Sequence, residues 1–478
     1  MAKHDQYIGG NWVKGESYTP NINPSNLAES VGEYARGDKK QCEDAIHAAR
    51  DAADGWAQGG IQARADALDA IGTEILARRE ELGRLLAREE GKTLKEAIGE
   101  VGRAGYVFKF FGGEALRLSG ELTPSVRPGV RVEVTREPLG VVGIITPWNF
   151  PIAIPAWKIA PALAFGNTVV FKPAELTPGC GWAIADIISR SGIPAGVFNL
   201  VVGKGSVVGD TIVKSRDVNG ISFTGSVETG HQILVEATKR HAKVQLEMGG
   251  KNPLVVLDDA DLDVAVDCAV NGAFFSTGQR CTASSRLIVT ERIHDRFVDS
   301  VVHKLEALRV GDAVAEGTDI GPVVDQKQLD QDLSYIEIGK KEGARLVYGG
   351  ERVAADTEGY YLSPALFVDT DNQMRINREE VFGPVASVVR VKNYDEAIEV
   401  ANDTDFGLSA GIVTTSLKHA SEFKKASRAG MVMVNLPTAG VDYHVPFGGT
   451  KGSSYGPREQ GGYAKEFYTT VKTAYVTA

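Results

Sequence analysis

The run LGVVGIIT at residues 139–146 is almost entirely apolar and stops at Pro147. An uninterrupted apolar run of this length indicates a strand that is buried on both faces, as strands are in parallel sheets. Similar apolar runs follow at 168–171, 197–202 and 220–223, and the segments 153–165, 178–191 and 206–215 between them have helical character. Regular alternation of strands and helices predicts an α/β fold with a doubly wound parallel sheet.

A second series of strand and helix candidates begins after residue 250. Its strands are expected at 253–257, 286–290, 344–349, 384–391, 410–414 and 431–435, and its helices at 261–275, 292–307 and 394–402. Helices are also expected over residues 40–118, where apolar residues recur at helical spacing. The sequence therefore predicts two α/β domains, and the crevice between such domains commonly holds a ligand.

Composition limits the classes of function. The chain has 478 residues, of which 43% are hydrophobic and 24% charged, which excludes wholesale disorder. Lys and Arg number 52 against 62 Asp and Glu, and this net charge of −10 argues against a broad nucleic-acid surface. We expect a cytoplasmic protein without a membrane span, because there is no secretory leader and no run of about 18 apolar residues.

Two strand ends carry polar residues in stiff loops. TPWNFP at 146–151 places Asn149 where its amide can donate to an oxyanion, although a simple turn would also explain it. FKPAE at 171–175 places Lys172 and Glu175 where they can bracket a ribose, and the alternative is an exposed ion pair. A carboxylate at Glu175 would repel a 2′-phosphate.

Three further motifs follow the strands of the first series. Gly205 and Gly209 belong to a G-x-G-x-x-x-G pattern that departs from the dinucleotide fingerprint and fits a plain turn. In FTGS at 223–226, Ser226 is placed to cap a helix and to meet a phosphate. Glu247 precedes a Gly-Gly turn at the junction of the two halves, where it can act as a general base.

Four cysteines in so long a chain indicate a reducing compartment and no disulfide framework. Cys281 is the candidate nucleophile, because it lies in a polar loop beside Arg280, which can favour the thiolate. Cys42 and Cys268 fall in helical segments and Cys180 in a Gly-Cys-Gly turn, so we interpret them as inert. We expect no metal site, since no C-x-x-C, H-E-x-x-H or histidine cluster is present.

Taken together, the motifs form a specific pattern. PWNFP, FKPAE, FTGS, LEMGGKN, GQRC, EEVFGP and PFGG occur in one order along nearly the whole chain. This order resembles the NAD(P)-dependent aldehyde dehydrogenase superfamily. The resemblance implies a Rossmann-like cofactor domain, a catalytic domain and a small β oligomerisation element in a homodimer or homotetramer. The implied ranges are 1–119 and 139–250 for the cofactor domain, 251–450 for the catalytic domain, and 120–138 and 451–478 for the oligomerisation element.

The resemblance also implies a role for particular residues. Cys281 would be the nucleophile, Glu247 the base and Asn149 the oxyanion donor, with Lys172 nearby. Cofactor contacts are implied for Thr146, Pro147, Trp148, Lys172, Glu175, Gly205, Gly209, Phe223, Gly225, Ser226, Glu380 and Phe382. Substrate contacts are implied for Phe150, Trp157, Arg280 and Phe447.

The choice of substrate and cofactor is narrowed by two segments of the sequence and by the charges of Arg280 and Glu175. Residues 438–445 and 454–459 look like the branch that oxidises α-ketoglutaric semialdehyde (2,5-dioxopentanoate) to 2-oxoglutarate. Arg280 suits an acidic substrate, and the alternative is that it pairs with a neighbouring acid. Trp157 stands where many succinate semialdehyde dehydrogenases carry an Arg. Succinate semialdehyde and aromatic or aliphatic aldehydes are therefore the alternatives, and Glu175 favours NAD over NADP.

Two alternatives of a different class are a CoA-acylating dehydrogenase and a non-enzymatic binding protein on the same fold. Glu247 argues against the first, because an acylating enzyme needs no water-activating base. The presence of Cys281, Glu247 and Asn149 together argues against the second.

Overall fold

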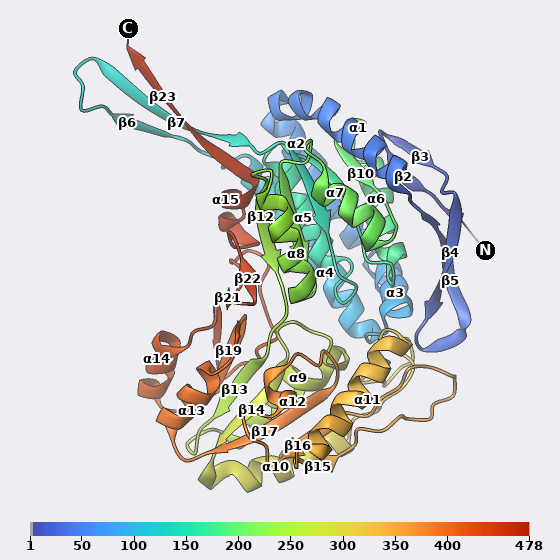
Figure 1. The fold of residues 1–478 in the computed structure, drawn as a ribbon, viewed down its shortest axis with the longest axis vertical. Helices are drawn as coiled ribbons and strands as arrows, with labels where there is room; N and C mark the ends of the chain where they lie inside the picture. Colours follow the sequence, from blue (N-terminus) through green and yellow to red (C-terminus); the bar gives the residue numbers. More distant parts are fainter. Residues whose placement is uncertain (1–2, 478) are drawn as a thin grey trace.

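The computed structural model describes residues 3–477 and has two large sheets, one in the upper half of Figure 1 and one in the lower half. The strands of the upper sheet are β2 (Gln6–Ile8), β3 (Asn11–Val13), β8 (Val141–Ile145), β9 (Thr168–Lys172), β10 (Phe198–Leu200), β11 (Gly220–Thr224), β12 (Lys243–Glu247) and β22 (Ser454–Tyr455). Their order is β22-β12-β11-β8-β9-β10-β2-β3. The central strands from β12 to β10 are parallel, which confirms the α/β class expected from the apolar runs.

The edges of this sheet differ from the expectation. β2 pairs with β10 in the antiparallel direction, and β3 extends the sheet by one more antiparallel strand. At the other edge β22 is antiparallel to β12. The segment 451–478, expected to lie wholly in the oligomerisation element, therefore begins inside the first sheet, because its first residues cover an otherwise open edge.

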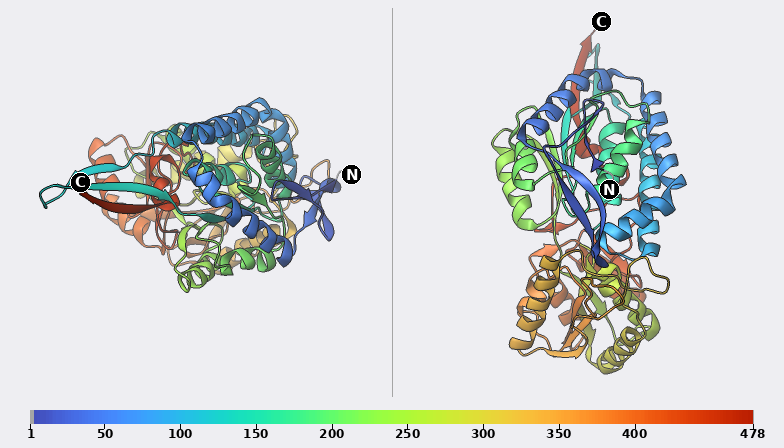
Figure 2. Two further views of the ribbon diagram at one scale, coloured as in Figure 1. Left: turned by 90° about the horizontal axis from the view of Figure 1, so that it is seen from above. Right: turned by 90° about the vertical axis from the view of Figure 1, so that its right-hand side faces the viewer.

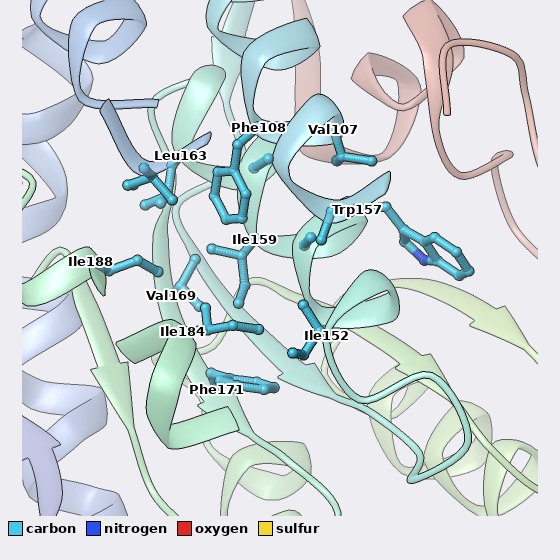
Figure 3. Close-up of a cluster of buried hydrophobic side chains, with 14 of the residues drawn as sticks. Val107, Phe108, Ile152, Trp157, Ile159, Leu163, Val169, Phe171, Ile184 and Ile188 are labelled. Carbon is cyan, nitrogen blue, oxygen red and sulfur yellow. The ribbon is translucent and has the colours of Figure 1, made fainter. Parts of the chain in front are cut away.

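Helices cover both faces of the upper sheet. One face carries α2 (Ile61–Ala77), α3 (Arg79–Glu90), α4 (Leu94–Ala115), α5 (Ala153–Ala164) and α6 (Pro178–Ser189). The opposite face carries α1 (Lys39–Gln58), α7 (Asp210–Lys214) and α8 (Val227–Thr238). Phe108, Ile159 and Trp157 all belong to the first of these cores, and Trp157 lies at one side of the cluster in Figure 3.

Two local expectations were wrong. The helix expected at 206–215 begins as a π-helical turn, Gly205–Gly209, before α7. Cys180, expected in a turn, lies in the first turn of α6, where Pro178 starts the helix because its missing N–H has no partner there in any case.

The second sheet is also mainly parallel. Its strands are β13 (Asn252–Val256), β14 (Ser284–Thr290), β15 (Arg345–Tyr348), β16 (Ala365–Val368), β17 (Val385–Val391), β19 (Ser409–Val413) and β20 (Met431–Val434), in the order β15-β16-β17-β14-β13-β19-β20. β15 is antiparallel to β16, a strand that the sequence did not indicate.

Helices pack around the second sheet in three groups. α9 (Leu262–Phe274) and α10 (Glu291–Glu306) share one core, and α13 (Tyr394–Asn402) and α14 (Leu417–Ala426) share another. α11 (Gln326–Lys341) and α12 (Arg375–Arg378) pack on a third core beside β16 and β17. The two-domain α/β architecture is thus the observed one.

Three smaller sheets complete the fold. They comprise β1 (Lys3–His4), β4 (Ser17–Asn23) and β5 (Asn26–Arg36); β18 (Phe406–Gly407) and β21 (Thr450–Lys451); and β6 (Glu121–Pro124), β7 (Val130–Pro138) and β23 (Thr469–Thr477). The sheet of β6, β7 and β23 projects from the body in Figures 1 and 2, and its strand β23 follows the short helix α15 (Lys465–Tyr468). None of the helices within residues 3–477 is both long and apolar enough to cross a membrane.

Candidate active site

A cavity of about 420 Å³ lies at the carboxyl ends of β8 and β11, where the first half of the molecule meets the second. Eight of the residues singled out from the sequence line it: Pro147, Trp148, Asn149, Gly225, Ser226, Cys281, Glu380 and Phe382. The structure therefore brings motifs that are up to 235 positions apart (147 to 382) to one place. Ligands of open α/β sheets bind at this end of the strands.

A second cavity, of about 780 Å³, adjoins the π-helical turn, α7 and α8. Gly205 and Gly209 line it. Glu175 lies beside it, since its carboxylate accepts a hydrogen bond from the N–H of Gly205 at 3.2 Å. Lys172 is buried, and its Nζ donates to the carbonyl of Pro173 at 2.7 Å; burial lowers the pKa of this lysine to about 8.

The residues of the first cavity fit a dinucleotide. The hydroxyls of Thr146 and Thr224 are buried at the ends of β8 and β11 and have no hydrogen-bond partner within the described chain. Ser226 caps α8 by accepting from the N–H of Thr229 at 3.3 Å, so the positive end of the helix opens into the cavity. Phe223 lies in β11, and its ring belongs to the hydrophobic core.

A strained loop precedes Cys281. Ser276 and Thr277 have φ angles of 50° and 55°, and Gly278 has φ 66°. A Cβ at Gly278 would lie 2.2 Å from the carbonyl oxygen of Gly383, so a side chain has no room at this position. Non-glycine residues in this region of φ are uncommon and cluster at functional sites.

Two side chains hold this loop in place. The carboxylate of Glu96 on α4 accepts from the N–H of Ser276 at 2.8 Å and from Arg280 at 3.1 Å. Asn252 donates to the carbonyl of Cys281 at 2.7 Å. The guanidinium of Arg280 is therefore engaged by Glu96, and Arg280 does not line the cavity that was expected to hold the substrate.

The thiol of Cys281 is in an environment that favours its neutral form. Burial, followed by the negative charges of Glu380 and Glu247, raises its pKa to about 12. The expected help from Arg280 is not among the influences on this thiol. The other three cysteines are fully buried, with burial raising the pKa of each thiol, as their inert interpretation requires.

Asn149 is fixed from both of its ends. Its Nδ2 donates to the carbonyl of Gln279 at 3.0 Å, which brings the amide to the Cys281 loop. The backbone carbonyl of Asn149 accepts from Nζ of Lys92 at 2.6 Å, and Lys92 is itself paired with Glu100 at 2.8 Å. The candidate oxyanion donor is thus held by a buried ion pair that the sequence did not reveal.

Glu247 does not line this cavity, although the next two residues, Met248 and Gly249, do. Its carboxylate accepts from the hydroxyl of Ser454 at 2.5 Å and from the amide of Gln245 at 3.3 Å. Burial, followed by the negative charge of Glu459, raises the pKa of Glu247 well above its ordinary value. Glu459 in turn forms a buried ion pair with Lys158.

The candidate substrate residues lie elsewhere around the site. The Nζ of Lys92 stands 3.7 Å from the ring centre of Phe150. Trp157 and Phe447 form an aromatic pair with ring centres 5.4 Å apart. None of Phe150, Trp157, Arg280 and Phe447 lines the 420 Å³ cavity.

Several residues of the site were missed from the sequence: Lys92, Glu96, Glu100, Arg103, Lys158 and Gln460. Ser454 and Glu459 were noted only as part of the segment 454–459, without their contacts. Most of these residues lie on amphipathic helices or in the glycine-rich segment near the end, where a charged residue is normally a solvated one. The one usable signal was the pair Thr93 and Glu96, a capping box that marks the start of α4.

A cysteine thiol and an amide donor that share a cavity, at the carboxyl ends of the strands of a parallel sheet, are typical of the enzymes that oxidise aldehydes with a nicotinamide cofactor. The model of the aldehyde dehydrogenase family matches residues 12–474, and the chain belongs to this family. It is an oxidoreductase that acts on aldehydes.

Two curated relatives and one solved structure are similar over nearly the whole chain. An alpha-ketoglutaric semialdehyde dehydrogenase of Bacillus subtilis is 43% identical over 98% of this chain and 97% of its own length. A 2,5-dioxopentanoate dehydrogenase of Saccharolobus solfataricus is 43% identical over 99% of both chains. The betaine aldehyde dehydrogenase of Staphylococcus aureus in complex with NAD+ has a TM-score of 0.97 and 36% identity, and covers 99% of this chain and 95% of its own.

Proposed function

We propose that the protein oxidises α-ketoglutaric semialdehyde (2,5-dioxopentanoate) to 2-oxoglutarate. The observation that carries the chemistry is that Cys281, Asn149 and the candidate cofactor residues share one cavity. The substrate is supported by the two relatives of that named activity, which are similar over nearly their full length.

The reaction begins at Cys281. Its thiolate adds to the aldehyde carbon, and the carbonyl π electrons become an oxyanion on the resulting thiohemiacetal. The Asn149 amide and the backbone N–H of Cys281 donate hydrogen bonds to this oxyanion. The bound nicotinamide ring supplies the acceptor for the hydride that the tetrahedral carbon loses. The carbonyl then re-forms, and the substrate remains on Cys281 as a thioester.

Glu247 has the second task. Its carboxylate takes a proton from water, the hydroxide adds to the thioester carbon, and the carbon–sulfur bond breaks to release the acid. The raised pKa of Glu247 suits a base that operates near neutral pH. The side chain has to rotate from Ser454 towards Cys281 to do so, because it does not line the cavity when bonded to Ser454.

For the cofactor we propose NAD in preference to NADP. Glu175 is held beside Gly205, which lines the second cavity. We expect the ribose of the cofactor to bind here, next to the negative charge of Glu175. Its carboxylate accepts hydrogen bonds from a ribose and repels a 2′-phosphate. Lys172, Thr146, Trp148 and the glycines of the two cavities would complete the cofactor contacts.

For the domains we propose the assignment drawn from the resemblance, with residues of β22 kept in the first sheet. The cofactor domain is built on the upper sheet and the catalytic domain on the lower one. We propose that the projecting sheet serves assembly into a homodimer or homotetramer, since its exposed apolar side chains include Leu122, Val471 and Tyr475.

The test is a steady-state comparison of 2,5-dioxopentanoate, succinate semialdehyde, benzaldehyde and pentanal, each with NAD and with NADP. We expect the highest kcat/KM for 2,5-dioxopentanoate with NAD and 2-oxoglutarate as the product. A CoA-acylating enzyme would instead form acyl-CoA when CoA is supplied, and a binding protein would reduce no nicotinamide with any aldehyde.

A further inference from the structure

We propose that Arg103, together with Gln460, binds the carboxylate of the substrate and so sets the preference of the enzyme for aldehydes that carry an acid group. This inference rests on the proposed function. It assigns the acid-binding role to a residue of α4 in place of Arg280, which is engaged by Glu96.

Arg103 does not line the catalytic cavity, but two residues of α5 connect it to the cavity. Its guanidinium carbon stands 5.2 Å from the ring centre of Trp157. Trp157 is one helical turn beyond Ile154, which lines the cavity together with Cys281. Trp157 belongs to the core drawn in Figure 3 and lies at one side of it, and the guanidinium of Arg103 lies over its ring.

The charge of Arg103 is incompletely compensated. Among residues 3–477, none of the carboxylates lies within 4.0 Å of its guanidinium. Nη2 donates to Oε1 of Gln460 at 3.0 Å, but Nε is buried and has no hydrogen-bond partner in the described chain. A guanidinium that has a buried, unpartnered N–H and no counter-ion is costly, which points to an anion that arrives from outside.

Gln460 supplies a second unused donor. Its side chain is fully buried, its Oε1 is taken by Arg103, and its Nε2 has no partner among the described residues. Its backbone is held at φ 59° and ψ 173°, a conformation that is rare for a residue with a side chain. Arg103 and Gln460 thus offer two N–H donors from adjacent side chains, and a carboxylate has two oxygens to accept them.

The groups that face Arg103 leave it cationic. Burial lowers its pKa to about 10, while Glu100, the Cys281 thiol and Asp442 oppose this effect. Glu100 is already used, since it binds Lys92 and the N–H groups of Ile152 and Ala153. Asp442 is exposed and forms no ion pair with Arg103. The influence of Cys281 places the guanidinium within electrostatic range of the reacting thiol.

The test compares kcat/KM for 2,5-dioxopentanoate with kcat/KM for pentanal, an uncharged aldehyde of equal chain length. We expect Arg103→Met to lower this ratio by about 10- to 100-fold, mainly through KM, because a charge-assisted hydrogen bond is lost. Arg103→Lys should keep part of the preference. Lys109→Met is the matched control, since it removes one positive charge from the same helix, where Lys109 pairs with Asp69 at 2.6 Å.

A binding measurement accompanies the kinetics. Glutarate, a dicarboxylate of the same length, should protect Cys281 from alkylation by iodoacetamide in the wild type and in Lys109→Met, but not in Arg103→Met. If the wild type does not favour 2,5-dioxopentanoate over pentanal, the proposed substrate is wrong. If it does, and Arg103→Met keeps both the ratio and the protection, the role of Arg103 is wrong while the proposed function stands.

A loss of fold in Arg103→Met, detected by its melting temperature, leaves two other variants for the same two measurements. Arg103→Lys keeps the charge and changes the donor geometry, and Gln460→Leu removes the second donor. We expect a lower ratio and weaker protection in both. Unchanged values in both variants would overturn the proposal.

Discussion

The ammonium group of Lys92 donates a hydrogen bond of 2.6 Å to the backbone carbonyl of Asn149. Lys92 precedes α4, and Asn149 follows β8, so this bond ties the helical layer to the catalytic end of the sheet. Glu100 completes the connection by pairing with Lys92 at 2.8 Å and by accepting from the N–H groups of Ile152 and Ala153. The loop that carries Asn149 is therefore held by a buried ion pair.

Replacing Lys92 by Met should destabilise the protein and misplace Asn149. The change leaves Glu100 buried without its counter-ion, and breaking a buried pair in this way costs about 3–5 kcal/mol. We expect a clearly lower melting temperature and a lower kcat in any protein that folds. Lys95→Met, an exposed position in the same turn of α4, is the control. Equal melting temperatures for the two variants would contradict the structural role of Lys92.

The central strands could be predicted because both of their faces are buried. A strand such as β8 is apolar throughout, and its sequence shows this directly. β12 was missed although it lies in the same sheet, because Gln245 and Glu247 point into a buried polar network with Ser222 and Lys158. The sequence KVQLE at 243–247 therefore has the pattern of an exposed segment.

Site residues could be predicted where they belong to a short continuous motif. They could not be predicted where their role depends on a contact with a residue far away in the sequence. Asn149 and Cys281 lie in short, distinctive loops whose residue types already suggest their chemistry. Lys158 follows Trp157 in a helix of apolar residues, and its partner Glu459 is 301 positions away. Arg103 was missed for the same reason, since only the fold shows that no carboxylate of the described chain pairs with it.

The reactivity of Cys281 should depend strongly on pH. Because burial and the charges of Glu380 and Glu247 raise its pKa to about 12, the thiolate fraction is small at neutral pH and grows as the pH rises. We expect the rate of alkylation by iodoacetamide to increase steadily from pH 7 to pH 10 without a plateau. Mass spectrometry identifies the modified residue, and Cys281→Ala serves as the control. A plateau near pH 7 would show that the thiol is already ionised there.

Replacing Glu247 by Gln should separate the two halves of the reaction. Thiolate addition and hydride loss need Cys281 and Asn149, whereas hydrolysis of the thioester needs a base for water. We expect a burst of about one reduced cofactor per active site, followed by turnover slower by about 10²- to 10⁴-fold. Stopped-flow absorbance measures both phases. A variant that loses the burst along with the turnover would assign Glu247 a role before hydride loss.

Replacing Ser454 by Ala should move the pH dependence of hydrolysis. The Ser454 hydroxyl donates to the Glu247 carboxylate at 2.5 Å and lowers a pKa that burial raises. Without this donor the pKa of Glu247 rises further, so the unprotonated base appears only at higher pH. We expect the acidic limb of the kcat profile to shift to higher pH. Tyr455→Phe, which removes an exposed hydroxyl from the next residue, should leave the profile in place.

Replacing Glu175 by Gln tests the preference for NAD. The amide oxygen of Gln can still accept from the N–H of Gly205, which Glu175 does at 3.2 Å, so the loop keeps its contact while the negative charge is removed. Two like charges near the protein surface repel by about 1–2 kcal/mol once solvent screening is included, so the ratio of kcat/KM for NADP to that for NAD should rise about tenfold. Glu43→Gln removes an equal charge from α1, outside both cavities, and is expected to leave the ratio unchanged. An unaltered ratio in Glu175→Gln would mean that another group selects the cofactor, and Lys172, buried beside Gly209, would then be the next residue to replace.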